Sequence, residues 1–279
     1  MTRADAGEAN GPPREGGEPE PDLAPRCFRL RIEYDGTDFE GWQVQKGDAR
    51  TVQGSLCAAL ARLGRGPVRV VGAGRTDAGV HAEGQVAAAR LATRLPPEAL
   101  RRALNAHLPR DVGVLEVAPA APDFDPRRAA RRKLYRYQIW NGRDRSPLRA
   151  RRWAPVHRRL EVGAMARAAA ALEGRHDFTS FRAAGSSVKT SVRTLFRAEV
   201  AGEPGGEIVV ELEGDGFLRH MVRNVVGTLV EVGHGARSPE GMPALLAARD
   251  RGLAGPTAPA RGLTLVRVDL ATPDDTHSI

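Results

Sequence analysis

The chain has 279 residues and carries 42 Lys and Arg against 34 Asp and Glu, which gives a formal net charge of +8. Its hydrophobic fraction of 41% can bury a sizeable core, and its length predicts two domains or one large composite domain. Because it holds no run of about 18 apolar residues and opens without the apolar core of a secretory signal, we expect neither a membrane span nor export. Two lone cysteines, Cys27 and Cys57, make no disulfide framework or metal set and fit a reducing cytoplasm.

The positive charge is concentrated in one stretch of the chain. Residues 125–159 hold twelve arginines and Lys133 against Asp125 and Asp144, a local net charge of +11. Residues 1–26 are net −3, because three arginines face six acids there. A dense basic segment predicts a phosphate-backbone partner, and a solvated basic face or a general preference for arginine is the alternative.

The periodicity of apolar residues predicts an α+β fold built from two similar halves with mostly antiparallel sheets and helices on one face. Residues 1–26 and 272–279 have few large apolar side chains and are expected to be disordered tails. The first half, 27–122, is expected to run β-α-β-β-α-β: strands at 27–34, 68–71, 85–91 and 112–117, with helices after the capping residue Thr51 and from Pro96. The second half, 123–271, is expected to hold strands at 134–140, 192–200, 208–212 and 263–270, and helices at 160–172, 217–232 and 241–250.

A glycine-rich loop at residues 72–81 follows a predicted strand. A dinucleotide fingerprint would need glycine where Asp77 stands, so that interpretation is rejected. What remains is a flexible loop that presents Arg75 and Asp77 together, or an aspartate that only bonds its own turn. The acids at 35–40 are more typical of a turn than of a glycosidase pair, and no metal, acyl-nucleophile or P-loop spacing occurs.

Two further segments contain candidate functional residues. Tyr135 and Tyr137 share one face of a strand inside the basic stretch, where aromatic rings could stack on exposed bases. The alternative is a pair of core tyrosines, which we favour for Tyr137. Arg223 lies in a strongly apolar helix, so we expect it either to snorkel or to pair with an acid from another loop.

The loop at residues 74–81, Gly-Arg-Thr-Asp-Ala-Gly-Val-His, resembles the signature loop of the tRNA pseudouridine synthase A family. The resemblance runs from about Phe28 to Val268. Further blocks follow in the family's order: Tyr34-Asp35-Gly36 with Gly41-Trp42-Gln43, Tyr135-Arg136-Tyr137, His176-Asp177-Phe178 with Ser180-Phe181-Arg182, Phe217-Leu218 through Met221-Val222-Arg223-Asn224, and Ala258-Pro259-Ala260 before Gly262-Leu263. One block departs, because the family's Phe-His-Ala-Arg reads Phe124-Asp125-Pro126-Arg127 here.

This resemblance implies the pseudouridine synthase fold, with the active-site cleft between the two halves. It also implies a cytoplasmic homodimer that needs neither cofactor nor metal and isomerises uridine to pseudouridine at positions 38, 39 and/or 40 of the tRNA anticodon stem-loop. By resemblance Asp77 is the nucleophile. Attack at uracil C6, attack at ribose C1′ and a glycal route all remain open.

The resemblance gives roles to three more residues. Arg223 matches the ion-pair partner of the aspartate, and Tyr135 matches a substrate-contacting tyrosine that would stack on the uracil and could move a proton. Arg75 would bind a phosphate or steer the flipped nucleotide. Two alternatives stand beside this interpretation: a non-catalytic tRNA-binding protein on the same fold, disfavoured because Asp77 and Arg223 are both present, and a synthase acting on another RNA.

Overall fold

The computed structural model of the chain describes residues 23–64, 66–185 and 188–271. Almost all of the two expected tails lies outside these ranges. The elements of the first half are β1 (Arg26–Tyr34), α1 (Val52–Leu63), β2 (Val70–Gly72), β3 (His81–Leu91), α2 (Pro97–His107) and β4 (Val112–Pro119). The predicted β-α-β-β-α-β order is confirmed, and Thr51 caps α1 by accepting a hydrogen bond from the backbone N–H of Gly54.

The second half contains the remaining strands and helices. They are α3 (Pro126–Ala129), β5 (Ala130–Trp140), β6 (Ala154–Pro155), α4 (Val162–Ala170), β7 (Gly174–Asp177), β8 (Val192–Gly202), β9 (Glu207–Gly214), α5 (Met221–Gly233), α6 (Met242–Ala248) and β10 (Leu263–Leu270). Short 3₁₀ turns separate several of them. All predicted strands and helices of this half are present, β10 with the predicted ends and the others with one or both ends shifted. The short elements α3, β6 and β7 were not predicted.

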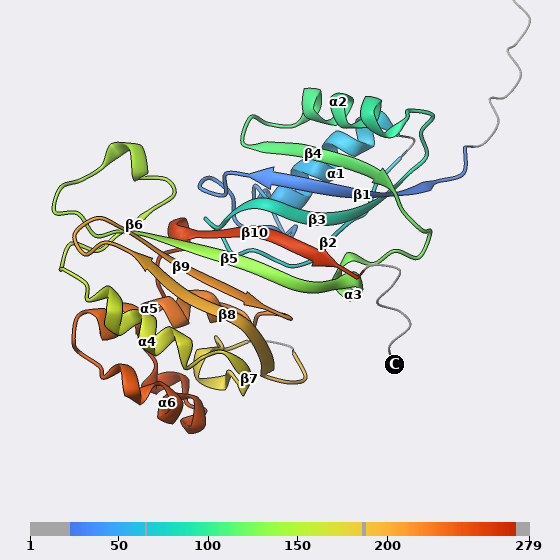
Figure 1. Cartoon of the computed structure of the whole chain (residues 1–279). Helices are drawn as coiled ribbons and strands as arrows, with labels where there is room; N and C mark the ends of the chain where they lie inside the picture. Colours follow the sequence, from blue (N-terminus) through green and yellow to red (C-terminus); the bar gives the residue numbers. More distant parts are fainter. Residues whose placement is uncertain (1–22, 65, 186–187, 272–279) are drawn as a thin grey trace, which may run out of the picture.

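The strands of both halves form one ten-stranded sheet instead of two separate ones (Figure 1). Its order is β4-β1-β3-β10-β5-β9-β8-β7, with β2 added beside β3 and β6 beside β5. The last strand, β10, joins the halves, because it pairs antiparallel with β5 and parallel with β3 through Thr264–His81 and Leu265–Ala82. Because the last described strand lies in the middle of the sheet, the two halves depend on each other. The boundary near residue 122 stays a prediction.

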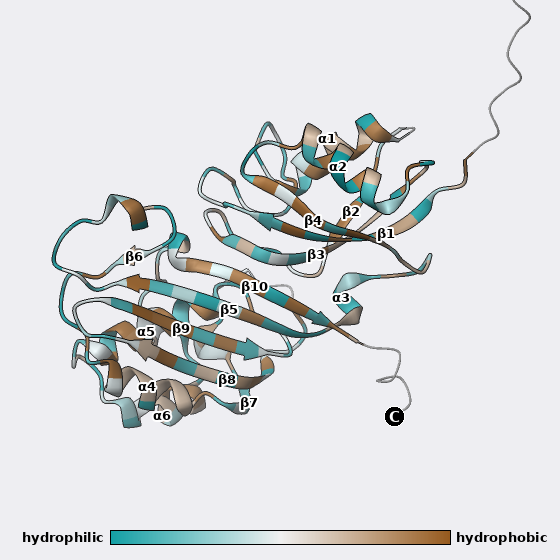
Figure 2. Ribbon diagram, turned by 45° about the horizontal axis from the view of Figure 1, so that its top comes forward, coloured by the Kyte–Doolittle hydropathy of each residue, from teal (hydrophilic) through white to brown (hydrophobic). Residues whose placement is uncertain are grey.

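The helices bury the apolar faces of the strands. Figure 1 shows α1 and α2 gathered beside the strands of the first half, and α4, α5 and α6 beside those of the second. Along several strands hydrophilic and hydrophobic residues alternate, which is the pattern of a sheet with one covered face (Figure 2). Tyr137 and Ile139 of β5 are almost fully buried, as is Leu30 of β1, so the core runs continuously beneath both halves.

Two element ends differ from the predictions at positions that matter for the site. β3 begins at His81, four residues before its predicted start, because His81 and Ala82 pair with β10. α5 begins at Met221 and not at Phe217, because His220 has a φ of 59°, which an α-helix cannot contain. No helix within the described ranges is long and apolar enough to cross a membrane.

Candidate active site

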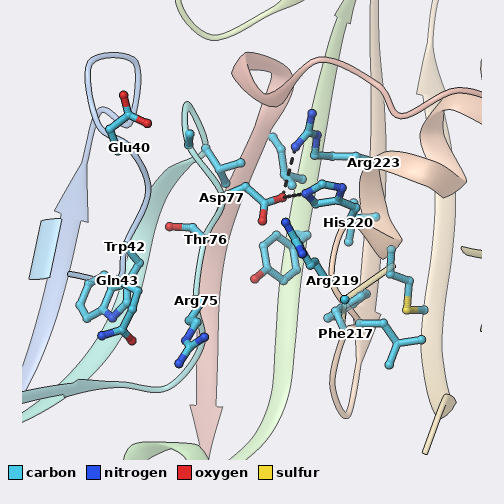
Figure 3. A pocket seen from close by; sticks show the side chains of 18 of the residues that line it. Glu40, Trp42, Gln43, Arg75, Thr76, Asp77, Phe217, Arg219, His220 and Arg223 are labelled. Atoms are coloured by element: carbon cyan, nitrogen blue, oxygen red, sulfur yellow. Dashed lines mark hydrogen bonds and ion pairs between the residues drawn. The ribbon is translucent and has the colours of Figure 1, made fainter. Parts of the chain in front are cut away.

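A cavity of about 840 Å³ opens between the two halves. The first half lines it with the loop before α1, which carries Trp42, and with residues 75–78 and Val80 of the loop between β2 and β3. The second half contributes Tyr135 of β5, residues 217–223 and Leu263 at the start of β10. Figure 3 shows Asp77 reaching into this space toward His220 and Arg223 from the opposite wall.

The loop that carries Asp77 is held at Thr76 through both its backbone and its side chain. The Thr76 carbonyl accepts a hydrogen bond from the Trp42 N–H at 3.0 Å, and the Thr76 hydroxyl lies 2.8 Å from the hydroxyl of Tyr34. Burial raises the pKa of Tyr34 to about 12, so this phenol keeps its proton at neutral pH. The position of Asp77 is therefore fixed by its neighbours and not by the glycines around it.

Gly41 is needed because the loop before α1 passes directly over the Asp77 loop. Its φ is +97°, and a Cβ placed there would lie 2.8 Å from the Thr76 carbonyl oxygen and 3.2 Å from the Asp77 carbonyl carbon. Only glycine tolerates both this backbone conformation and this approach. The motif at 41–43 thus acts on the site through contact with the backbone of residues 76–78.

Two side chains hold the start of the same loop. Lys133 of β5 donates to the Ala73 carbonyl at 2.9 Å, and the buried Gln85 of β3 donates to the Gly74 carbonyl at 2.9 Å. Burial lowers the pKa of Lys133, with the nearby Arg193 adding to the effect. One of only three lysines in the chain is thus used to tie the second half to the Asp77 loop.

Asp77 and Arg223 form an ion pair across the cavity. Arg223 Nη1 lies 3.2 Å from Asp77 Oδ2, and Arg223 Nε donates to the Ala258 carbonyl at 2.7 Å, which fixes the guanidinium from behind. The Asp77 side chain is 31% exposed and that of Arg223 15% exposed. The pair is therefore half-buried, with the carboxylate open to the cavity.

His220 approaches the same carboxylate oxygen, with Nε2 3.5 Å from Asp77 Oδ2 (Figure 3). Burial lowers the pKa of His220, the charge of Asp77 opposes this, and Arg223 adds to the lowering. The imidazole is thus mainly neutral at neutral pH.

Tyr135 lies beneath the site with 7% of its surface exposed. Its ring packs edge-on against Phe217 with centroids 5.0 Å apart. Burial raises the pKa of its hydroxyl, and the negative charge of Asp77 raises it further. The phenol is protonated at neutral pH, and Tyr135 is one of the residues that line the cavity that Asp77 enters.

Arg75 is exposed on the rim of the cavity, and Figure 3 shows its side chain directed away from Asp77. It has no ion pair within the described ranges. Tyr137, by contrast, is 1% exposed and donates to the Pro259 carbonyl at 2.8 Å, so its expected core role is confirmed.

The sequence predicts four site residues, Asp77, Arg223, Tyr135 and Arg75. The structure places all four around one cavity. Sequence reasoning missed His220 and Lys133. His220 was one of seven histidines without metal spacing, and its contact with Asp77 depends on a backbone conformation that no periodicity reveals. Lys133 was counted only as part of the basic stretch, although its rarity as a lysine was a usable signal.

The basic stretch itself is partly neutralised, by Asp125 within it and by acids from elsewhere in the chain. Its ion-paired members are Arg127 with Asp125, Arg136 with Glu83 and Glu211, Arg149 with Glu207, Arg151 with Asp35 and Asp38, and Arg152 with Glu83. Those without an ion pair in the described part of the chain are Arg128, Arg131, Arg132, Arg143, Arg145, Arg158 and Arg159. Charge counted along the sequence therefore overstates the cation density that a partner would meet.

Comparison of the sequence with known proteins shows which family the chain belongs to. A family model described as tRNA pseudouridine synthase matches residues 31–127 and 168–269. The chain belongs to the tRNA pseudouridine synthase family. Curated relatives named tRNA pseudouridine synthase A include one from Moorella thermoacetica, 50% identical over 87% of this chain and 99% of the relative, and one from Myxococcus xanthus, 48% identical over 86% and 91%.

A third tRNA pseudouridine synthase A, from Geobacillus kaustophilus, is 48% identical over 85% of this chain and 92% of its own length. Among solved structures, a chain of a Cbf5-Nop10-Gar1 complex aligns with 85% of this chain over 48% of its own length. The identity is 13% and the TM-score 0.37, so this similarity is too distant to bear on function. The family assignment agrees with the α+β, mostly antiparallel fold. Within the described ranges no three His, Cys, Asp or Glu side chains gather in a group that could hold a metal ion.

Proposed function

We propose that this tRNA pseudouridine synthase isomerises uridine to pseudouridine at positions 38, 39 and/or 40 of the tRNA anticodon stem-loop, with Asp77 as the nucleophile. The observation that supports this most directly is the Asp77 carboxylate itself. It projects into a cavity of about 840 Å³, paired at 3.2 Å with Arg223 and still 31% exposed. A carboxylate that is open to the cavity and held beside a fixed cation is suited to attack a substrate atom.

The reaction exchanges one bond to the ribose for another. The N1–C1′ bond of uridine breaks, the uracil turns, the C5–C1′ bond forms, C5 loses its proton and N1 gains one. Nothing is oxidised or hydrolysed, so the chemistry asks for a nucleophile, a proton path and a pocket that holds the detached base. Attack at C6, attack at C1′ and a glycal route would all begin at the Asp77 carboxylate.

Tyr135 and Arg75 are proposed to handle the flipped nucleotide. Extruding a base from the stem costs a few kcal/mol, and stacking on an aromatic ring returns about 1–3 kcal/mol per base. Tyr135 lines the cavity beside Asp77, where its ring could take the uracil. Arg75 stands exposed on the rim, where a phosphate of the flipped nucleotide would pass.

The partner is proposed to be tRNA, held by the arginines of the basic stretch that have no acidic partner. Each phosphate contact releases a counterion, so binding should weaken steeply as salt rises. We further propose, on the family resemblance, that the protein works as a cytoplasmic homodimer without cofactor or metal. Its mass in solution, measured by light scattering, should be twice the 30.0 kDa of one chain.

The test is to incubate the purified protein with unmodified tRNA transcripts and map pseudouridine chemically. We expect conversion at one or more of the three anticodon-stem positions, without added metal or cofactor. A transcript with cytidine at all three positions is the control and should stay unmodified. Conversion only elsewhere in the tRNA, or only in another RNA, would contradict the assigned substrate.

A further inference from the structure

We infer that His220 is a positioning residue which, together with Arg223, fixes Oδ2 of Asp77 and so leaves Oδ1 as the oxygen that attacks. This inference rests on the proposed function, because it takes Asp77 as the nucleophile. It concerns how the carboxylate is aimed, which the ion pair with Arg223 alone does not determine.

The first observation is that both partners approach the same oxygen. Arg223 Nη1 lies 3.2 Å and His220 Nε2 3.5 Å from Oδ2, and Figure 3 shows the two contacts meeting there. Within the described ranges no hydrogen bond reaches Oδ1, whereas Arg223 donates to Oδ2. A carboxylate held by one contact can still rotate about its Cβ–Cγ bond, whereas two contacts from different directions fix its plane.

The second observation is the backbone of His220. Its φ of 59° and ψ of 4° are left-handed, and Arg249 is the other described non-glycine residue with a positive φ. This conformation is unfavourable for a residue with a Cβ, and such strain gathers at functional sites. His220 stands at the N-cap of α5, yet its side chain makes no capping hydrogen bond. The strained turn directs the imidazole at Asp77 instead.

The third observation is the charge around the ring. Besides Asp77, it faces Arg223, Arg219 and Arg251, all of which oppose protonation. A neutral imidazole carries one N–H to donate and does not add a second cation to the carboxylate. A contact of 3.5 Å is long, but such contacts tighten when substrate fills a site. His220 is thus suited to orient Asp77 without cancelling its charge.

Three variants test this in single-turnover reactions at saturating tRNA transcript. His220→Ala removes the donor and should slow pseudouridine formation by about 10- to 100-fold, the value of a hydrogen bond to a charged group, with the tRNA Kd unchanged. His220→Gln carries an N–H at a similar reach and should recover most of the rate. His220→Gly should be as slow as His220→Ala but melt at the same or a higher temperature, because glycine relieves the left-handed strain.

Wild-type protein is the positive control, and Asp77→Asn, which is expected to be inactive, is the negative control. If wild type makes no pseudouridine, the proposed function fails and the inference with it. If wild type is active and folded His220→Ala or His220→Gly keeps its rate, only the role of His220 is overturned. A glutamine variant as slow as alanine with a raised tRNA Kd would show that His220 binds substrate directly, which also contradicts a positioning role.

Discussion

Asp77 keeps 31% of its side chain exposed, and this sets how much its partner can contribute to stability. Replacing Arg223 by Ala leaves a carboxylate that water can still reach. We therefore expect the free energy of unfolding to fall by about 1–3 kcal/mol. The lower value is typical of an exposed ion pair, and the upper value is the smallest loss expected for a buried pair. Thermal or denaturant unfolding measures the loss.

The activity of the same variant should fall further than its stability. Without the guanidinium the carboxylate is free to rotate, so the single-turnover rate should drop by at least about tenfold, or ~1.4 kcal/mol in the barrier. Arg223→Lys is the matched control, since it keeps a cation but loses the Nε contact with Ala258, and it should be intermediate. Full activity in a folded Arg223→Ala protein would show that the ion pair with Asp77 is not needed for catalysis.

Tyr135 allows stacking and proton transfer to be separated. Because burial raises the pKa of its hydroxyl, Tyr135 keeps its own proton at neutral pH and can take a substrate proton only while passing that proton to an acceptor. Tyr135→Phe keeps the ring and should bind tRNA normally but lose about 10²–10⁴-fold in single-turnover rate. Tyr135→Leu removes the ring as well and should also weaken binding. A phenylalanine variant with the wild-type rate would leave stacking as the only role.

The residues of the site were predicted unevenly. Asp77, Arg223, Tyr135 and Arg75 could be found because they lie in motifs, and the cavity does gather them. His220 could not, because its approach to Asp77 depends on one left-handed φ angle. The outward direction of Arg75 also escaped prediction, since a position two residues from Asp77 fixes proximity along the chain but not where a long side chain points.

At the scale of elements, the loop before α1 makes the clearest prediction. Gly41→Ala should destabilise the protein by about 1–3 kcal/mol, because a Cβ is disfavoured at positive φ and there collides with the Thr76 carbonyl at 2.8 Å. Because that carbonyl precedes Asp77, catalysis should suffer as well. Melting curves and single-turnover rates measure the two effects.

Gly47→Ala is the matched control for this loop. Gly47 has a φ of +80°, but nothing lies within 4 Å of a Cβ placed there. It should therefore show the backbone strain without the loss of activity. Equal rates for the two alanine variants would mean that close contact at Gly41 does not position Asp77.

Most helices and strands could be predicted because apolar periodicity and caps are local signals. The start of α5 could not, since Phe217 fits the apolar face of the helix but packs against Tyr135 in the cavity instead. The joining of two half-sheets into one could not either. β10 pairs with β3 through Thr264 and His81, which are far apart in sequence. No sequence pattern at either residue indicates that the two strands pair.

At the scale of the whole molecule, His81 lies where the two halves meet and contacts backbone groups of both. It is fully buried, its Nδ1 accepts from the Gly36 N–H at 3.0 Å, and its Nε2 faces the carbonyl oxygens of Arg151 and Arg261 at 3.0 and 3.1 Å. Burial lowers the pKa of His81 below its ordinary value of 6.5, although the Asp35 carboxylate opposes this. The folded protein therefore keeps this ring neutral.

Stability should consequently depend on pH in a defined window. The unfolded chain binds a proton at His81 below about pH 6.5 while the folded protein resists it, so the free energy of unfolding is highest above that pH and falls as pH drops toward the lowered folded pKa. His81→Gln retains a donor for the carbonyls but cannot titrate. Denaturant unfolding at pH 8 and pH 5.5 should show a smaller loss for this variant than for wild type, and identical losses would exclude His81 as a cause.

Whether Asp77 performs the isomerisation of uridine in tRNA can be measured with the single variant Asp77→Asn. The amide keeps the shape of the side chain but cannot act as the nucleophile, so the variant should bind an anticodon stem-loop transcript with nearly wild-type affinity. It should form no pseudouridine at positions 38–40 in a reaction that wild type completes. Measurable pseudouridine from a clean Asp77→Asn preparation would contradict the account.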